Sequence, residues 1–170
     1  MSQFLIGSTD RDKNLESVFP RLTQNAQMEI EKIFIGSYFT NKHYIHPILS
    51  KSSFMSRCEG EAWPDSRRAG LFKGVTAFSR LYLAVVALGA INASPNETSL
   101  LGHFCQQTND QTSGRTGDVF SALDFAKFYF GLARQAMGDL FESSCLETAQ
   151  ALLLLVGSYQ SGLRNKLTSN

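Results

Sequence analysis

The sequence has few cysteines, few charged residues and no long hydrophobic segment, and each shortage excludes a class of protein. Its three cysteines, Cys58, Cys105 and Cys145, are far apart and form no C-x-x-C pair, which fits reduced intracellular thiols rather than a disulfide framework. The longest apolar run, residues 81–91, is well short of the roughly 20 residues that a membrane-spanning helix needs. Only three consecutive apolar residues precede the first charges, so we expect neither a signal peptide nor a membrane partner.

The sequence also has almost no excess of positive over negative charge. The formal net charge is +1, from 16 Lys and Arg against 15 Asp and Glu. These charges are spread along the chain, so neither half forms the concentrated basic surface that nucleic-acid binding requires. The pairs Arg67 with Arg68 and Arg164 with Lys166 fit a solvated loop and a solvated tail. With 43% hydrophobic and 18% charged residues, the chain is predicted to be one soluble globular domain.

Helical periodicity is the main pattern that the sequence does contain. Apolar residues recur at helical spacing from Thr23 towards Pro47. The residues expected to face solvent on this helix are Gln27, Glu29, Glu31 and Lys32. Ser50 is a candidate N-cap for a short helix over 51–57, and longer helices are predicted from about 71 or 75 to 92, from 119 to 141 and from 145 to 160. Because no stretch of five residues alternates convincingly, the predicted fold is an all-α, irregular multi-helix bundle.

The remaining segments have the composition of connections. Residues 1–22 are predicted to be an irregular lead-in and residues 161–170 a tail, on either side of a domain over 23–160. Residues 59–70 are predicted to be a polar connection that Trp63 attaches to the core. Residues 94–118 are rich in Ser, Thr, Asn, Gln and Gly, so they form either a functional loop or a disordered insertion, and we favour disorder for most of them.

Two of the predicted helices, 75–92 and 145–160, are apolar on nearly every side. In the second, the apolar residues at helical spacing include Leu146, Leu153 and Val156, and we expect this helix to lie at the centre of the fold. We also expect it to form an antiparallel hairpin with the helix before it. The 75–92 helix contains several small residues, which would let a neighbouring helix approach closely: Ala84, Ala87, Gly89 and Ala90. Two amphipathic helices can hardly cover both apolar ones, so we expect the chain to be the N-terminal part of a larger α-helical domain.

Five short segments of the sequence carry a resemblance to a known family. Tyr38, Phe39, His43, Pro47 and Phe54 stand in the spacing Y-F-x3-H-x3-P-I-L-x4-F. The other segments are LAVVALGAI at 83–91, FYFGLAR at 128–134, which ends at Arg134, the helix at 146–159, which contains Gln150, and FLIGST at 4–9. In their order along the chain, with the 4–9 segment first, they resemble the fungal-specific transcription factor domain, the middle regulatory region of the zinc-cluster (Zn2Cys6-type) activators of fungi.

The resemblance implies a non-catalytic regulatory domain that acts in the nucleus and contributes to the regulation of DNA-templated transcription. The implied partners are a homologous factor or transcriptional co-regulators, with a small-molecule effector as a further candidate. The family's mechanism implies that such a contact shifts the helix packing and so exposes or masks an activation function.

Two features of the family have no counterpart in this sequence. Family members hold two zinc ions in an N-terminal C-x2-C-x6-C cluster that docks on DNA, and they carry later helices with an R-x-A-x-x-L-G-L-H-like segment. We therefore expect no zinc in this chain, and DNA contact only through a segment that the sequence does not contain. The first alternative is a truncated interaction fragment that pairs with a homologous factor. A small helical enzyme or ligand carrier is the least favoured alternative.

No catalytic, cofactor or metal site is predicted, although several residues were candidates. His43 and His46 have a spacing that can share a metal on one helix, but Pro47 breaks the helix there and no third ligand is near in sequence. Cys58 has no orienting partner in the sequence, so an inert thiol is favoured over a nucleophile. Gln150 lies in an otherwise apolar helix, where a hydrogen bond across the helix hairpin is favoured over a role in an effector pocket. The residues predicted to form the structural family signature are Tyr38, Phe39, His43, Pro47, Phe54, Arg134 and Gln150.

Overall fold

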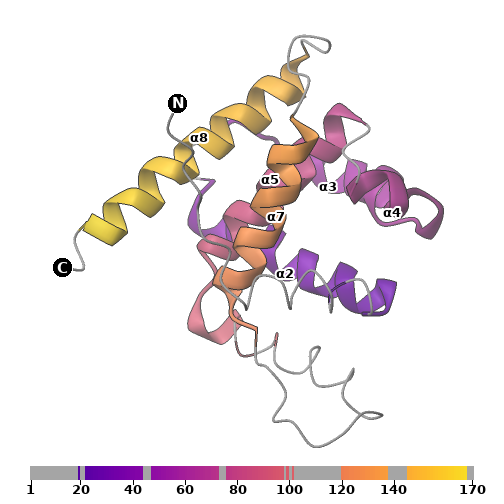
Figure 1. The fold of residues 1–170 in the computed structure, drawn as a ribbon. Helices are drawn as coiled ribbons and strands as arrows, with labels where there is room; N and C mark the ends of the chain where they lie inside the picture. Colours follow the sequence, from indigo (N-terminus) through magenta and orange to yellow (C-terminus); the bar gives the residue numbers. More distant parts are fainter. Residues whose placement is uncertain are drawn as a thin grey trace, which may run out of the picture.

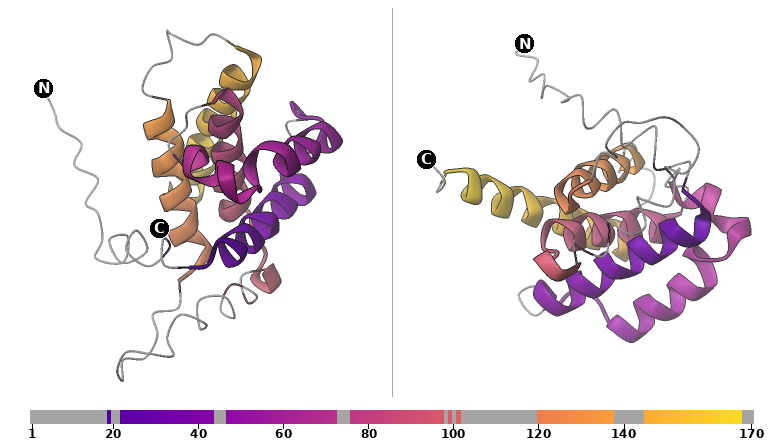
Figure 2. Two further views of the ribbon diagram at one scale, coloured as in Figure 1. Left: turned by 90° about the vertical axis from the view of Figure 1, so that its right-hand side faces the viewer. Right: turned by 90° about the horizontal axis from the view of Figure 1, so that it is seen from below.

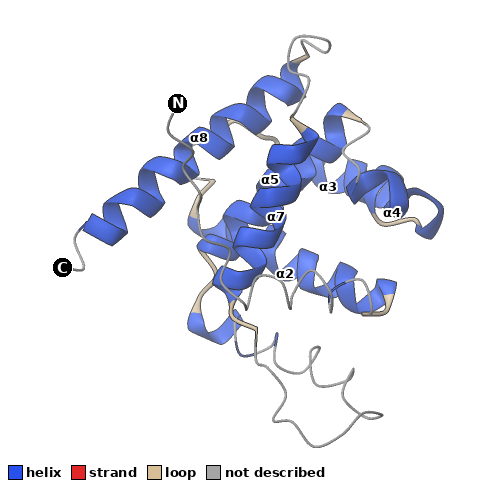
Figure 3. Ribbon diagram, viewed as in Figure 1, coloured by secondary structure: helices blue, strands red, loops and turns tan. Residues whose placement is uncertain are grey.

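The computed structural model describes residues 19, 22–43, 47–72, 76–97, 99, 101, 120–137 and 145–167. These residues form seven helices and no strand (Figure 3), so the prediction of an all-α multi-helix fold is confirmed. The helices are α2 (Gln24–Asn41), α3 (Lys51–Arg57), the π-helix η2 (Cys58–Ala62), α4 (Asp65–Phe72), α5 (Ala77–Ile91), α7 (Ala122–Ala136) and α8 (Leu146–Leu167). Figure 1 labels the α-helices.

Helix α5 is the centre of the fold. Helices α2, α7 and α8 each pack against it (Figures 1 and 2). Every residue from Leu81 to Ala90 is buried, which matches a helix with an apolar residue or glycine at each of these positions. The expectation that the 145–160 helix occupies the centre is therefore wrong, because α8 lies on the outside of α5.

The predicted hairpin between the last two helices does not form in the described part of the chain. Helices α7 and α8 pack against α5 rather than against each other. Helix α8 begins at Leu146 and continues to Leu167, seven residues beyond the predicted end. Its C-terminal part extends beyond the other helices (Figures 1 and 2).

Side-chain caps fix where several helices begin. The hydroxyls of Thr23, Ser50, Thr76 and Ser121 accept hydrogen bonds from backbone amides of the first turns of α2, α3, α5 and α7. The predicted short helix over 51–57 and its Ser50 cap are confirmed. The cap at Ser121 places the start of α7 at Ala122, three residues after the predicted start.

The predicted polar connection over 59–70 is mostly helical, which corrects the sequence interpretation. Helix α3 runs into the π-helical turn Cys58–Ala62, and α4 follows from Asp65. Trp63 joins the two and donates a hydrogen bond from Nε1 to the hydroxyl of Tyr82 over 3.3 Å, so its predicted attachment to the core is confirmed. The polar composition of this segment does not reveal that Arg68 is buried in the core.

The close contact between α2 and α5 depends on Gly89. A Cβ atom at this position would lie 1.8 Å from the carbonyl oxygen of Phe34. The two backbones therefore touch, and the predicted close approach at the small residues of α5 is confirmed at Gly89.

Most of the predicted disordered segment lies outside the described residues, as do His46 and Cys105.

Candidate functional site

Four of the signature residues form one aromatic cluster at the end of α2. The ring of Phe39 lies 5.0 Å from Tyr38, 5.1 Å from His43 and 5.8 Å from Phe54, measured between ring centroids. His43 Nε2 lies 2.6 Å from the carbonyl oxygen of Leu49 in a hydrogen bond that fixes the chain between α2 and α3. Burial raises the pKa of the Tyr38 hydroxyl to about 12. The cluster holds the α2 to α3 connection in place.

Gln150 links α8 to the same connection. Its Nε2 donates a hydrogen bond to the carbonyl oxygen of Ile48 over 2.7 Å. The predicted bond across a helix hairpin is therefore replaced by a bond to the segment before α3, which contains the exposed Pro47. Arg134 lies apart from the other signature residues, exposed on α7 beside a separate hollow of 330 Å³.

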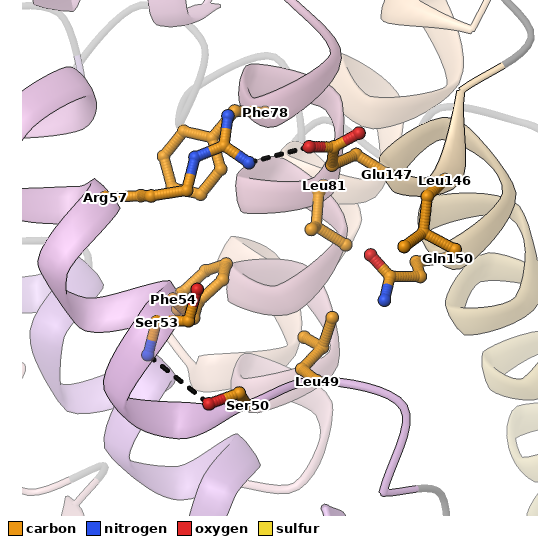
Figure 4. A pocket seen from close by; sticks show the side chains of 10 residues that line it. All are labelled: Leu49, Ser50, Ser53, Phe54, Arg57, Phe78, Leu81, Leu146, Glu147 and Gln150. Carbon is orange, nitrogen blue, oxygen red and sulfur yellow. Dashed lines mark hydrogen bonds and ion pairs between the residues drawn. The ribbon is translucent and has the colours of Figure 1, made fainter.

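A small hollow lies where the first turns of α8 meet α3 and α5 (Figure 4), and Gln150 lines it. Its volume is 240 Å³, below the range of about 300–1,000 Å³ typical of ligand cavities. Arg57 spans the hollow: its Nη1 lies 2.8 Å from Glu147 Oε1, its Nε lies 2.9 Å from Glu61 Oε1, and its guanidinium stacks over Phe78. Hydrogen bonds from the Glu147 backbone, and then from Arg57, lower the pKa of the Glu147 carboxyl. The polar contacts of Glu147 and Gln150 around this hollow attach α8 to the rest of the molecule.

One face of α8 is apolar and open to solvent. Leu146, Leu153 and Val156 are 71%, 63% and 56% exposed, and Ala149 between them is also exposed. We call these four residues the outer stripe. The opposite face of the helix packs on the core with Thr148, Ala151, Leu154 and Leu155. The sequence prediction that places Leu146, Leu153 and Val156 in the core is therefore wrong.

The spacing of the outer stripe is that of a coiled-coil seam. Its residues follow one another at intervals of three, four and three along α8. In the sequence the same intervals continue through Gln160, Leu163 and Leu167, the last residue of α8. Helix α8 therefore presents one apolar face to α5 and carries a second apolar pattern on the opposite side.

A buried polar network connects four helices, and sequence reasoning missed it. Glu31 of α2 is fully buried and accepts hydrogen bonds from Tyr82 of α5 over 2.7 Å and Tyr129 of α7 over 3.0 Å. Arg68 of α4, only 3% exposed, donates to both Glu31 oxygens from Nη1 and Nη2 over 3.0 and 2.9 Å. Gln27 is also buried and accepts from Arg68 over 3.4 Å.

This network corrects two predictions. Glu31 and Gln27 face the core rather than solvent, and Arg68 is not part of a solvated loop. Burial, followed by the nearby Glu31 carboxylate, raises the pKa of Tyr82 and Tyr129 well above its usual value, so both remain neutral hydrogen-bond donors. A helical wheel gives no sign of this pairing, because the partners are 37 to 98 residues apart.

Cys58 is buried beside this network. Burial, followed by the Glu31 and Glu59 carboxylates, raises the pKa of its thiol to about 12, so the thiolate needed for nucleophilic attack is scarce at neutral pH. Among the described residues, no three His, Cys, Asp or Glu side chains are grouped as a metal site. Of the basic pair that was predicted to lie in a solvated loop, Arg67 is exposed and Arg68 is buried.

Comparisons of the whole chain with family models, with curated proteins and with solved structures find no match. Within the described ranges, no single helix is long and apolar enough to cross a bilayer. Helices α4 and α5 reach that length and composition only as a pair bent by 79°.

Proposed function

We propose that this chain is a non-catalytic regulatory domain that works through protein contacts made by the outer stripe of α8. We further propose that it belongs to the regulatory region of a fungal zinc-cluster-type transcription factor and acts in the nucleus. The observation that carries the proposal is the exposed apolar face: a row of large apolar side chains on a helix favours a protein partner over open solvent. The family resemblance supports the transcriptional role.

The spacing of the stripe favours a helix as the partner. Intervals of three and four place apolar side chains along a seam into which a second helix can pack its own. Gln160 adds one polar residue to this seam in the sequence, and a single polar seam position often sets the register of a pair. A helix that extends beyond its neighbours gains stability from such a partner, because short isolated helices are marginal in water.

The polar contacts at the start of α8 provide a means of regulation. The Arg57–Glu147 ion pair and the Gln150 bond to Ile48 attach the first two turns to the connection between α2 and α3. A partner or effector that binds one arrangement of these contacts better than another would shift the position of α8. Zinc and direct DNA contact would come from the family's C-x2-C-x6-C segment, and this sequence has no such motif.

The second candidate function is an interaction module that pairs with a homologous factor and competes for its partners. The coiled-coil spacing of the outer stripe favours it, because a homologue would carry the same helix. A second copy of this chain is the nearest testable example of such a partner.

The molar mass of the purified full chain in solution tests the proposed contact. Replacing Leu153 and Val156 by glutamate places charges in the stripe, and we expect it to weaken association by at least about tenfold. Leu123→Glu is the matched control, because Leu123 is a 57% exposed leucine on α7. A chain that is monomeric with and without the substitutions, and that binds no homologous helix, would contradict the proposal.

The transcriptional role needs its own measurement. The full chain is fused to an unrelated DNA-binding domain, and transcription of a reporter gene in a fungal cell is recorded. We expect the fusion to change reporter output, and the double glutamate variant to lose most of that change while Leu123→Glu keeps it. Unchanged output from the unmodified fusion would refute the transcriptional role and leave the interaction module standing.

A further inference from the structure

The two ends of α8 carry opposite charges. In the sequence, its first turn contains Glu147, its last turn contains Arg164 and Lys166, and the helix has no other charged residue. The structure adds to the acidic character of the first end. Glu147 and Glu61 both pair with Arg57, and two carboxylates around one guanidinium leave an excess of negative charge. The start of α8 is therefore suited to the basic end of another helix.

The attachment of α8 to the rest of the molecule is also one-sided. As far as its side chains are described, the buried residues of α8 lie in its N-terminal half, from Thr148 to Leu155. Its C-terminal part extends beyond the other helices (Figures 1 and 2). The 22 residues of α8 span about 33 Å. A second α8 that runs in the opposite direction can therefore cover the outer stripe with its extended part.

The charges of α8 favour this opposite direction. In a parallel pair, the basic last turns of both helices would lie together, and like charges side by side disfavour the complex. In an antiparallel pair, each basic end meets the acidic end of the other helix. Such a pair has two-fold symmetry, so both copies use the same stripe and neither stripe is left uncovered. Charge complementarity thus identifies a second copy of the chain as a fitting partner.

The intervals of the seam set the register of this antiparallel pair. One register gives every residue of the outer stripe a seam residue of the other copy: Leu146 meets Leu163, Ala149 meets Gln160, and Leu153 meets Val156. Ala149 is the smallest residue of the stripe, so it leaves room for the amide of Gln160. A shift of one heptad toward the C-terminus would leave Leu146 without a seam partner. The register above therefore covers the stripe best.

We propose that the partner of the outer stripe is a second copy of this chain, with the two α8 helices antiparallel in this register. The proposal rests on the proposed function, which assigns the stripe to a partner helix, and it adds the identity and direction of that helix. In the resulting dimer the remaining helices of the two copies lie at opposite ends of the α8 pair.

Cysteine crosslinking tests the direction and register on the full chain. Cys105 and Cys145 are replaced by serine, and the buried Cys58 is kept. Ala149→Cys is introduced into one preparation and Gln160→Cys into a second that carries a longer affinity tag. The two are mixed with oxidised glutathione, and linked dimers are separated on non-reducing gels. We expect dimers that contain one chain of each kind.

Each preparation alone should give at least about fivefold less linked dimer than the mixture. In the proposed register, two copies of the same position are separated by about 16 Å along the helix axis, whereas a disulfide needs Cα atoms within about 7 Å. Leu123→Cys on α7, mixed with Gln160→Cys, measures the background, because Leu123 is exposed outside α8. The proposal is overturned if Ala149→Cys links efficiently to itself, or if the mixture gives no more than the background.

Neutralising the basic end gives opposite results for the two directions. Arg164→Gln combined with Lys166→Gln should weaken self-association about threefold or more at low ionic strength, and high salt should remove the difference. The same change would strengthen a parallel pair. Arg67→Glu is the control, because it changes the net charge equally and Arg67 is exposed on α4. Sedimentation equilibrium measures all three chains. Stronger or unchanged association of the double variant, or an equal effect of the control, overturns the proposal.

These outcomes are separate from a failure of the proposed function. If the chain does not pair with itself but binds a homologous helix, and Leu153→Glu with Val156→Glu weakens that binding, the antiparallel dimer is overturned and the proposed function stands. If the chain neither pairs with itself nor binds such a helix, both are overturned.

Discussion

Helices α5 and α8 each contain an apolar run, Leu81 to Ile91 in α5 and Ala151 to Val156 in α8, but the two runs have different environments. Every residue of α5 from Leu81 to Ala90 is buried, whereas α8 exposes Leu146, Leu153 and Val156. The difference lies in their neighbours: α2, α7 and α8 all pack on α5, while α8 has α5 as its main neighbour. An apolar circumference therefore permits a helix to be central but does not place it there. The exposed face of α8, which carries the outer stripe, is the surface that we propose binds a protein partner.

The largest effect that separates the two helices should come from their glycines. In Gly89→Ala on α5, the new Cβ would meet the Phe34 carbonyl oxygen at 1.8 Å, and neither backbone can move without separating α2 from α5. We expect a loss of about 5 kcal/mol in the free energy of unfolding, at the extreme for one substitution. Gly157→Ala on α8 is the control, because its Cβ has no neighbour within 4 Å, and it should stabilise by about 0.5–1 kcal/mol. Urea denaturation followed by circular dichroism measures both, and equal effects would contradict the close packing of α2 on α5.

The next largest contrast is between the buried Glu31–Arg68 ion pair and the partly exposed Arg57–Glu147 ion pair. Glu31→Gln leaves the Arg68 charge buried without its partner, and we expect a loss of about 3–5 kcal/mol. Glu147→Gln removes one of the two carboxylates paired with Arg57 at the base of α8, where the Arg57 and Glu147 side chains are about one-third exposed, and it should cost less than about 1 kcal/mol. The same denaturation experiment compares the two. A loss below 1 kcal/mol for Glu31→Gln would show that Arg68 finds solvent in the folded protein.

Two adjacent leucines divide α8 itself into an inner and an outer face. Leu154 is 3% exposed and Leu153 is 63% exposed. Leu154→Ala should destabilise the protein by about 2–3 kcal/mol, because it leaves a cavity against α5. Leu153→Ala should change the stability by no more than about 0.5 kcal/mol at concentrations low enough to keep the chain monomeric. Equal losses at low concentration would mean that the outer stripe is covered within one molecule.

The smallest effect is a pH dependence confined to α8. The pKa of Glu147 is lowered from 4.5 in the folded protein, so its contribution is present above about pH 4.5 and is lost as the pH falls through the lowered value. We expect the hydrogen-exchange protection of the first turns of α8 to fall over that acidic range while the protection of α5 stays constant. Glu147→Gln should abolish the difference. The prediction fails if the variant shows the same acid dependence as the unmodified chain.

Local features of the fold were predictable from sequence. The Ser50 cap and the helix after it depend on residues within one turn, and their prediction is confirmed. The small Gly89 in an apolar run indicated a close helix contact, and the contact with Phe34 bears this out. Burial of Glu31 and Arg68 was not predictable, because each charge is tolerated only through the other and the two lie 37 residues apart in the sequence.

The candidate sites also combine features that could be predicted from the sequence with features that could not. The spacing of Leu146, Leu153 and Val156 on a helix is a property of the sequence, but their exposure is not, and they were predicted to lie in the core. A hollow beside Arg68 had no signal in the sequence, since its walls come from helices α2, α4 and α7 and from Phe19 and Leu22 before α2. Gln150 was singled out correctly as an unusual polar residue, yet its partner, the Ile48 carbonyl, lies 102 residues away.

The sequence by itself determined that the chain is helical, that Ser50 caps a short helix, and that two of the helices are apolar on nearly every side, because these properties depend on neighbours three or four residues apart. Only the tertiary structure decided which apolar helix became the centre and which kept a free face. That choice depends on contacts between distant segments, and here it follows from the backbone contact of α2 at Gly89 and the packing of α7 and α8 on α5.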